Sequence, residues 1–450
     1  MRIRLDIPLY TEEIINAVSS AKAEKNAKKI EYITTDSREV ERGDLFVALN
    51  GPYESGERYV SEAKSRGAVC LSRQAGSGII TVSDTLLSLQ NIANYYKKKL
   101  PKLKYTAGVT GSVGKTTTKD FLKTIASGQY NTHATYKNFN NHIGVPLTIL
   151  SADKDTELLI LEMGMNHRGE ISALSKCACP DIGIITNIGT AHIGNLGSRE
   201  RIAEAKLEIK DGMSSPHLII PYGEPLLSCV THKTTFAVNN SLADIYIIYN
   251  EEKIILKSGT ESYELSFGPR GQHMAECLCA ATAAATRLGI NLCDIVRQIS
   301  SIQDEIPRQT INSVKHFYIL PDYYNASFES VSAALKLLSS MKKYKRRSAL
   351  LGTVKELGEK GEEIHKKIGR CAATSGIQSL FLFGEFSDYM CEGALEAGMT
   401  PDRIFINSNE SDPEKTANQI IKFSLPGELI LFKASNATGL CRIVDLLRHK

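Results

Sequence analysis

Along most of this chain, short apolar runs alternate with longer segments in which polar and apolar residues mix. Residues 158–165 form one such run, and residues 182–187 form another. A run that is apolar on both faces is typical of a strand buried in a parallel sheet, which helices cover on both sides. The alternation therefore predicts an α/β fold.

The length of 450 residues is too great for a single hydrophobic core. We expect three domains, at residues 1–97, 98–307 and 308–450. The first is a small α/β domain, and the second contains a parallel sheet. The third alternates strands with helical stretches, which predicts a Rossmann-like layout. Its predicted strands lie at residues 348–351, 380–383, 403–406 and 428–432.

Other segments refine this division. Residues 45–49 and 68–71 are the predicted strands of the first domain, with a helix between them at residues 59–66. Residues 233–267 contain short β segments separated by polar breaks, and we expect them to be an insertion in the central domain. The Ala-rich residues 272–288 that follow predict a helix that returns to the domain core.

The clearest chemistry lies in residues 105–118, which predict a strand, a glycine-rich turn and the start of a helix. Gly111 and Gly114 let backbone N–H groups approach an anion, and the helix N-terminus adds further N–H groups. Lys115 can reach the β- and γ-phosphates of a nucleotide, and the Thr116 hydroxyl suits Mg²⁺. Because Val109 stands where a strict P-loop has glycine, this is a variant of that loop. The predicted nucleotide-binding residues here are Gly111, Ser112, Gly114, Lys115, Thr116 and Thr117.

Three further residues are candidates for chemistry beside this loop. Glu162 ends a buried apolar run, which is where ligands gather in open α/β sheets, and it is placed to hold Mg²⁺. A single histidine such as His192 is more often structural, and a helical lysine such as Lys206 is usually solvated. Only their expected position near Glu162 and the phosphate loop makes them candidates.

Two polar segments are weaker candidates for ligand binding. Thr35, Ser37 and Arg38 are expected on a loop, where they could bind a charged small molecule or form a solvated turn. Residues 137–146 are rich in side-chain amides, including Asn140 and Asn141.

Composition and charge limit what this protein is expected to bind and where it is expected to work. With 54 basic and 50 acidic residues, the net charge is +4, which is too balanced to favour nucleic acid or a membrane surface. No apolar run is long enough to cross a bilayer, and the first residues lack the pattern of a signal peptide. The ten cysteines form neither a zinc pattern nor a disulfide framework, so we expect reduced, mostly buried thiols in a cytoplasmic protein.

Taken in order, the motifs resemble one family. They are T-D-S-R at 35–38, T-G-S-V-G-K-T-T-T at 110–118, N-x-N-N-x-x-G-x-P at 138–146, E-M-G-M-N-H-R-G-E at 162–170, T-N-I-G-x-A-H at 186–192, A-K-L-E-I at 205–209 and D-Y-Y-N-A-S at 322–327. This order resembles the Mur ligases, and within them the MurF type, the UDP-N-acetylmuramoyl-tripeptide–D-alanyl-D-alanine ligases. The resemblance covers nearly the whole chain.

The resemblance implies an ATP-dependent amide ligase of peptidoglycan synthesis that works through an acyl phosphate. It implies a UDP-sugar domain, a central ATPase domain and a C-terminal Rossmann-like domain. It assigns metal binding to Thr116, Glu162, His192 and a carbamylated Lys206, and catalysis to Lys115, Glu162, His192 and Lys206. It assigns nucleotide contacts to Arg308, Asp322 and Asn325, and substrate contacts to Thr35, Ser37, Arg38, Asn140 and Asn141.

Departures from the family pattern concentrate toward the C-terminus. They include Pro307 before the hinge arginine, residues 273–277 in place of His-Asn-x-x-Asn, residues 351–356 in place of a Gly-Asp-Met segment, and residues 433–436 in place of Lys-Gly-Ser-Arg. A paralogous Mur-type ligase that joins another amino acid or dipeptide to a related carboxylate substrate is therefore an alternative. A folylpolyglutamate-type ligase, a kinase and an inactive ATP-binding partner are disfavoured. We expect a monomer.

Overall fold

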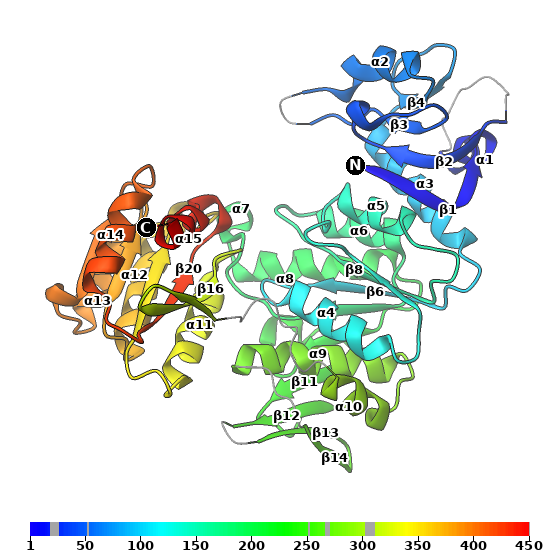
Figure 1. Ribbon diagram of the computed structural model, residues 1–450. Coiled ribbons are helices and arrows are strands. Elements are labelled where there is room, and N and C mark those ends of the chain that lie inside the picture. The colour runs from blue at the N-terminus through cyan, green and yellow to red at the C-terminus, as the bar shows by residue number, and fades with distance from the viewer. Residues whose placement is uncertain (19–26, 52–53, 251–252, 266–270, 302–310, 450) are drawn as a thin grey trace.

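The computed structural model describes residues 1–18, 27–51, 54–250, 253–265, 271–301 and 311–449. Within these ranges the chain forms three sheets of five, nine and six strands, each with its own helices (Figure 1). The predicted α/β fold with three units is confirmed. In the figure the N-terminal unit lies at the upper right, the central unit below it, and the C-terminal unit at the left.

The N-terminal sheet has the strand order β1-β2-β3-β4-β5. Its strands are β1 (Arg2–Tyr10), β2 (Lys29–Thr34), β3 (Leu45–Val47), β4 (Val69–Ser72) and β5 (Ile79–Thr81), and its helices are α1 (Thr11–Ala17), α2 (Val60–Ser65) and α3 (Thr85–Lys99). β1 pairs antiparallel with β2, and the later neighbours pair in parallel. The predicted strands at 45–49 and 68–71 are β3 and β4.

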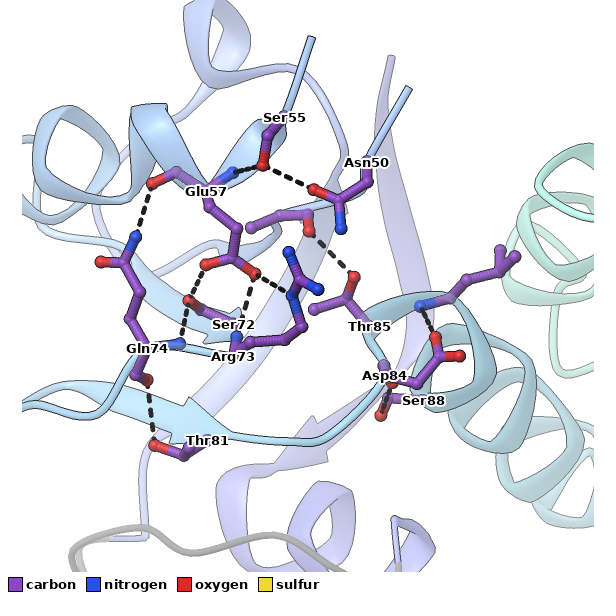
Figure 2. Close-up of polar contacts among 12 residues, drawn as sticks. Asn50, Ser55, Glu57, Ser72, Arg73, Gln74, Thr81, Asp84, Thr85 and Ser88 are labelled. Atoms are coloured by element: carbon purple, nitrogen blue, oxygen red, sulfur yellow. Dashed lines mark hydrogen bonds and ion pairs between the residues drawn. The ribbon is translucent and has the colours of Figure 1, made fainter. Parts of the chain in front are cut away.

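A polar network fixes the turn between β3 and α2 to the sheet (Figure 2). The Glu57 carboxylate accepts hydrogen bonds from the Ser72 hydroxyl and from the backbone N–H of Arg73. The Gln74 side chain donates to the Glu57 carbonyl at 3.1 Å, and the Ser55 hydroxyl donates to Asn50 Oδ1 at 2.6 Å. These bonds hold the end of β4 against the short 3₁₀ turn η2 (Gly56–Tyr59).

The central sheet has the order β14-β13-β12-β11-β10-β9-β6-β8-β7. Its strands are β6 (Tyr105–Thr110), β7 (Thr132–Ala134), β8 (Leu158–Glu162), β9 (Ile182–Ile185), β10 (Leu218–Pro221), β11 (Lys233–Val238), β12 (Ile245–Tyr249), β13 (Ile254–Ser258) and β14 (Glu261–Glu264). Its helices are α4 (Lys115–Ala126), α5 (Gly144–Leu150), α6 (Glu170–Ala178), α7 (Ile193–Leu196), α8 (Arg199–Leu207), α9 (Gln272–Arg287) and α10 (Leu292–Ser300). The two fully apolar runs, β8 and β9, flank β6 as buried parallel strands.

The β segments predicted at residues 233–267 are present as strands, but they are not separate from the central sheet. β11 pairs in parallel with β10 and β12 with β11, so these strands continue the central sheet. At its edge, β13 pairs antiparallel with both β12 and β14. The buried Phe236, Ile245 and Ile247 pack in one core with the Ala-rich helix α9, and this packing joins the strands to the domain.

The C-terminal sheet has the order β15-β16-β20-β17-β18-β19 and is parallel except for β15. Its strands are β15 (Asn312–Val314), β16 (Phe317–Asp322), β17 (Arg347–Gly352), β18 (Leu380–Phe383), β19 (Ile404–Asn407) and β20 (Leu429–Lys433). Its helices are α11 (Phe328–Ser340), α12 (Gly361–Thr374), α13 (Ser387–Glu396), α14 (Pro413–Phe423) and α15 (Leu440–His449). All four predicted strands are present.

Helix α3 connects the first two units. It contacts α5 and α6 of the central unit, and the buried Tyr96 hydroxyl donates to the Ala152 carbonyl at 2.9 Å. The same hydroxyl accepts from the N–H of Ile7 in β1 at 3.3 Å, so one side chain joins both units. The boundary near residue 97 stays a prediction, and the one at residue 307 lies outside the described residues.

Two compositional predictions can be compared with the structure. In the described part of the chain, every helix is too short or too polar to span a bilayer. The ten cysteines are free, as predicted, but only Cys70, Cys177, Cys277 and Cys279 are buried. The expectation of mostly buried thiols is therefore wrong, because Cys371 and Cys391 are only partly buried against the core and the other four are exposed.

Candidate nucleotide and cation site

The predicted phosphate loop connects β6 to α4. Gly111 (φ 147°) and Gly114 (φ 82°) both adopt left-handed backbone conformations, which glycine enters without strain. A Cβ at Gly111 would also collide with the Thr186 hydroxyl. Lys115 begins α4, and its ammonium group donates to the Gly111 carbonyl at 2.9 Å, so it lies over the loop.

The segment after β9 supports this loop. Asn187 Oδ1 accepts hydrogen bonds from the backbone N–H groups of Ser112 (3.1 Å) and Val113 (3.0 Å). The Thr186 hydroxyl donates to the Val113 carbonyl at 2.5 Å. The sequence analysis did not single out Asn187 as a functional residue. Its place directly after a buried strand, at the carboxyl end of the sheet, is the signal that could have found it.

A cavity of about 230 Å³ opens beside the loop, between the central and C-terminal units. Ser112, Gly114, Lys115, Thr116, Thr117, Asn140 and Glu162 line it from the central unit, and Asp322 and Asn325 line it from the C-terminal unit. The structure thus brings together most of the residues predicted to bind the nucleotide. Arg308 lies outside the described residues.

Glu162 is the last residue of β8 and only 2% exposed. Its Oε1 accepts a hydrogen bond from Asn140 Nδ2 at 2.8 Å, and its backbone N–H donates to the Thr135 hydroxyl at 2.9 Å. Its Oε2 is buried without a hydrogen-bond partner. Because a buried carboxylate oxygen without a partner is costly, a cation next to Oε2 would satisfy it, and the site fits Mg²⁺.

The two neighbouring asparagines differ in their contacts. Asn140 holds Glu162, and its carbonyl accepts from the N–H of Gly164 at 2.8 Å. Asn141 is exposed, and its Oδ1 accepts from the N–H groups of Ile143 (3.1 Å) and Gly144 (2.8 Å) at the start of α5. A role for either in binding the muramoyl substrate stays a prediction.

His192 lies at the start of α7 with a left-handed backbone (φ 63°). Its Nδ1 is 2.6 Å from Oε2 of Glu356 in the C-terminal unit, a close contact that is not aligned as a hydrogen bond. The interaction with His192, together with the charge of Lys115, holds the pKa of the Glu356 carboxyl below its ordinary value, although partial burial opposes this. Both residues line a second cavity of about 420 Å³.

Lys206 is in α8 and only 1% exposed. Burial, with a contribution from the charge of Lys115, lowers the pKa of this amine well below its ordinary value. Lys206 therefore does not have the solvated position that is usual for a helical lysine, and its neighbours Glu204 and Glu208 make other contacts. Glu204 instead lies 3.4 Å from Arg168, and the Glu208 carboxylate accepts from the N–H of Gly169 at 2.8 Å.

The cation candidates do not form a complete site by themselves. Among the described residues, no three His, Cys, Asp or Glu side chains lie together as a metal cluster would require. Glu162 lines the first cavity and His192 the second, and residues 325–327 line both. A complete shell of ligands therefore also needs phosphate oxygens, water or a modified Lys206.

On the C-terminal side, Asp322 and Asn325 are joined by a buried lysine. Lys433 Nζ lies 3.1 Å from Asp322 Oδ2 and donates to the Asn325 carbonyl at 2.6 Å. Burial and the charge of Lys433 lower the pKa of His273, which also lines the cavity, to about 4. This histidine is therefore neutral near pH 7.

With this geometry in view, comparison with known proteins identifies the family. Residues 109–285 match the family described as Mur ligase middle domain, and residues 308–436 match that described as Mur ligase, glutamate ligase domain. The chain is also 36% identical, over 93% of both chains, to the UDP-N-acetylmuramoyl-tripeptide–D-alanyl-D-alanine ligase of Bacillus subtilis (strain 168). The chain belongs to the Mur ligase family, and within it to the MurF type.

Solved structures agree with this assignment. MurF from Acinetobacter baumannii is 27% identical and superposes with a TM-score of 0.88 over 100% of both chains. MurF ligase from Thermotoga maritima, solved in complex with ADP, is 26% identical, with a TM-score of 0.80 over 93% of this chain and 97% of its own.

In this Mur ligase, the T-D-S-R segment lies apart from both cavities. The predicted loop is the 3₁₀ turn η1 (Ser37–Glu39), in which Ser37 is buried and the Arg38 guanidinium pairs with the Asp36 carboxylate at 2.6 Å. Arg66 donates to the carbonyls of Ser37 and Arg38. Thr35, Ser37 and Arg38 thus stay candidates for a separate binding surface on the N-terminal unit.

The departures from the family pattern surround the nucleotide side of this Mur ligase. His273 and Cys277 line the first cavity, and Val354, Glu356, Ser435 and Asn436 line the second. Pro307 lies outside the described residues. The altered positions thus concentrate where the C-terminal unit faces the phosphate loop.

Proposed function

We propose that this Mur ligase joins D-alanyl-D-alanine to UDP-N-acetylmuramoyl-tripeptide at the expense of ATP, in the synthesis of peptidoglycan precursors. The observation that carries the proposal is the 36% identity, over 93% of both chains, with the Bacillus subtilis ligase of that name. The ADP in the related Thermotoga maritima structure supports ATP as the nucleotide. The cavity between the phosphate loop and the C-terminal unit has residues suited to it.

In this reaction the terminal carboxylate of the tripeptide attacks the γ-phosphorus of ATP and ADP leaves, which gives an acyl phosphate. The amine of the dipeptide then attacks the acyl carbon, loses a proton and expels phosphate. The first step brings two anions together, so it needs positive charge fixed in advance. Lys115 and the N-terminus of α4 supply that charge at the loop.

We assign Mg²⁺ binding to Thr116, Glu162, His192 and Lys206, the last as a carbamate. When bound, Mg²⁺ would neutralise charge on the phosphates. The free Oε2 of Glu162 supports this assignment. The lowered pKa of the buried Lys206 amine supports carbamylation, because it favours the neutral form, whose lone pair can add to CO₂ with loss of a proton. The product is a carboxylate-like group suited to a hard cation.

The remaining assignments follow the family. Asn140 and Asn141 would face the muramoyl group, Thr35, Ser37 and Arg38 the UDP group, and Arg308, Asp322 and Asn325 the nucleotide. We further propose three domains at residues 1–97, 98–307 and 308–450, and a monomer that works in the cytoplasm without nucleic acid or membrane insertion.

Phosphate release with UDP-N-acetylmuramoyl-tripeptide tests the proposal, with the amine varied among D-Ala-D-Ala, D-Ala-D-Lac, D-Ala-D-Ser and single amino acids. We expect turnover with D-Ala-D-Ala and no phosphate release from Lys115→Ala, which removes the charge at the loop. The altered residues beside the second cavity favour one alternative, a Mur-type ligase for another amine or carboxylate. Turnover with a different amine, and none with D-Ala-D-Ala, would decide for it.

A further inference from the structure

A short segment of the central domain and one of the C-terminal domain meet beside His192. The N–H of Gly194 donates to the Glu356 carbonyl at 3.1 Å, and a Cβ at Gly194 would lie 2.5 Å from the nitrogen of Gly358. The N–H and hydroxyl of Thr190 both donate to the Glu329 carboxylate, at 2.8 and 3.2 Å. We call these five residues, Thr190, Gly194, Glu329, Glu356 and Gly358, the interdomain clasp.

The clasp brings two strained residues face to face. His192 (φ 63°) and Glu356 (φ 67°) are two of only six non-glycine residues with positive φ in the described ranges, and they lie in different domains. Such a backbone is strained, and it persists where the surroundings impose it, often at functional sites. Here both strained residues are at the contact in which the Glu356 carboxylate lies 2.6 Å from His192 Nδ1.

The chemistry of a histidine ligand gives this contact a meaning. A histidine that binds a metal through one ring nitrogen usually offers the N–H of the other to a carboxylate or carbonyl, which fixes the tautomer and the ring orientation. A carboxylate beside Nδ1 favours the tautomer with a proton on Nδ1. Nε2 then carries the lone pair that a cation needs.

We propose that Glu356 is a positioning residue for His192, so that a carboxylate of the C-terminal domain completes the cation site of the central domain. The proposal rests on the assignment of His192 to that site in the proposed function. Glu356 lies beside His192 Nδ1, so it would act on the cation through His192. Glu356 belongs to residues 351–356, a segment that departs from the family pattern. From the sequence alone, that departure is a sign of a different amine substrate.

Because of the clasp, the effect of Glu356 on His192 depends on the position of the C-terminal domain. Glu356 reaches His192 only while Gly194 and Gly358 lie in backbone contact, because all of these contacts belong to the same two short segments. Cation affinity and domain approach are therefore linked, and by reciprocity a bound cation favours the joined arrangement.

Manganese binding in the presence of ADP tests the proposal, with free Mn²⁺ measured by electron paramagnetic resonance. We expect Glu356→Ala to weaken Mn²⁺ binding about 10-fold or more, and Glu356→Gln to weaken it less, since an amide oxygen beside Nδ1 would also favour a proton on that nitrogen. Gly194→Ala should act in the same direction with Glu356 intact, because the added methyl separates the two segments. Glu385→Gln is the matched control, as Glu385 pairs with the neighbouring Lys355 at 3.0 Å but has no contact with His192.

A second measurement separates positioning from general damage. Nitrogen-15 spectra of histidine-labelled protein, with His192 assigned from a His192→Gln variant, should show protonated Nδ1 in the wild type and a mixture of tautomers in Glu356→Ala. Unchanged Mn²⁺ affinity and tautomer, with a raised KM for the amine, would overturn the proposal and make Glu356 an amine-binding residue. If the wild type itself bound no Mn²⁺ with ADP, the proposed cation site would fail as well. If the wild type and the Glu356 variants bound Mn²⁺ equally well, the role of Glu356 would be refuted, but the proposed cation site would stand.

Discussion

At the scale of single residues, the chemistry of this protein depends on charged groups removed from water. Lys206 is almost wholly buried, and no acidic side chain of the described ranges forms an ion pair with it. An ammonium ion in that position would be costly, so burial favours the neutral, nucleophilic form of the amine. Glu162 is equally buried, yet an asparagine holds only one of its two oxygens.

The first prediction concerns the modification of Lys206. Only the neutral amine adds CO₂, so activity should fall as pH drops through the lowered pKa of Lys206 and the amine gains a proton. Protein stripped of CO₂ should be inactive and recover with bicarbonate. Lys206→Ala should lose activity about 10³-fold or more and be partly rescued by formate or acetate. An active Lys206→Ala enzyme, or an unmodified amine in wild-type crystals, would refute carbamylation.

The second prediction uses two adjacent asparagines as a matched pair. Asn140→Ala removes the donor to Glu162 Oε1, so the carboxylate should turn and Mn²⁺ affinity with ADP should fall about 10-fold. Asn141→Ala removes an acceptor at the start of α5 and should lower stability while leaving Mn²⁺ affinity unchanged. Equal Mn²⁺ affinity in both variants would mean that Asn140 does not orient Glu162.

How far such residues could be predicted depends on where their partners lie in the chain. Lys115 and Glu162 were predictable because each lies at the carboxyl end of its own strand, and the carboxyl ends of those strands meet. Asn187 had the same signal and was overlooked. Glu356 had no usable signal, since its partner His192 is in another domain and their contact depends on how the domains dock.

At the scale of elements, apolar runs predicted the strands well but not the sheets they join. The runs at 158–165 and 182–187 became neighbours of β6 as expected, because they are apolar on both faces. The segments at 233–267 also formed strands, but their polar breaks concealed the pairing of β11 with β10. The alternation of polar and apolar residues along a strand shows which of its faces is exposed. Which strand lies beside it depends on backbone hydrogen bonds, and these leave no pattern in the side chains.

The third prediction concerns His365 in α12, which fixes the segment that carries Glu356. Its Nδ1–H donates to the Gly361 carbonyl at 2.6 Å, and its Nε2 accepts from the N–H of Val354 at 3.0 Å. Only a neutral ring can make both bonds, and burial lowers the pKa of His365 to about 4. At pH values between about 4 and the ordinary histidine pKa near 6.5, His365 is protonated in the unfolded chain but neutral in the folded one. Stability should therefore fall as pH falls, by up to about 3 kcal/mol.

Hydrogen exchange of peptides that cover residues 350–360 measures this effect, after correction for the intrinsic pH dependence of exchange. Protection should fall between pH 6.5 and 4 in the wild type. The fall should be smaller in His365→Gln, which has no titrating ring there. His449→Gln, at an exposed position near the end of α15, is the control and should match the wild type. The same pH dependence in all three proteins would rule out His365 as the cause.

At the scale of the whole molecule, the site belongs to no single unit. The phosphate loop lies on the central domain, whereas Asp322, Asn325 and Glu356 come from the C-terminal domain, beside α7 (Figure 1). The three units were predictable from length and the order of motifs. Their docking was not, because it relies on a few contacts such as Thr190 with Glu329, which carry no periodic signal.

The last prediction concerns the movement of the C-terminal domain. A ligand that contacts both walls of the cavity stabilises the joined arrangement over any in which the domains separate. Addition of ADP, Mg²⁺ and UDP-N-acetylmuramoyl-tripeptide should therefore reduce the radius of gyration measured by small-angle X-ray scattering. Glu329→Ala, which loses both bonds to Thr190, should increase that radius without ligands and enlarge the change on binding.

Glu363→Ala removes an exposed carboxylate of α12 that pairs with Lys367, and it should behave as the wild type. An identical radius with and without ligands, in wild type and Glu329→Ala alike, would mean that the domains are already locked. The clasp would then hold His192 in place permanently, and its effect on cation binding would not depend on closure.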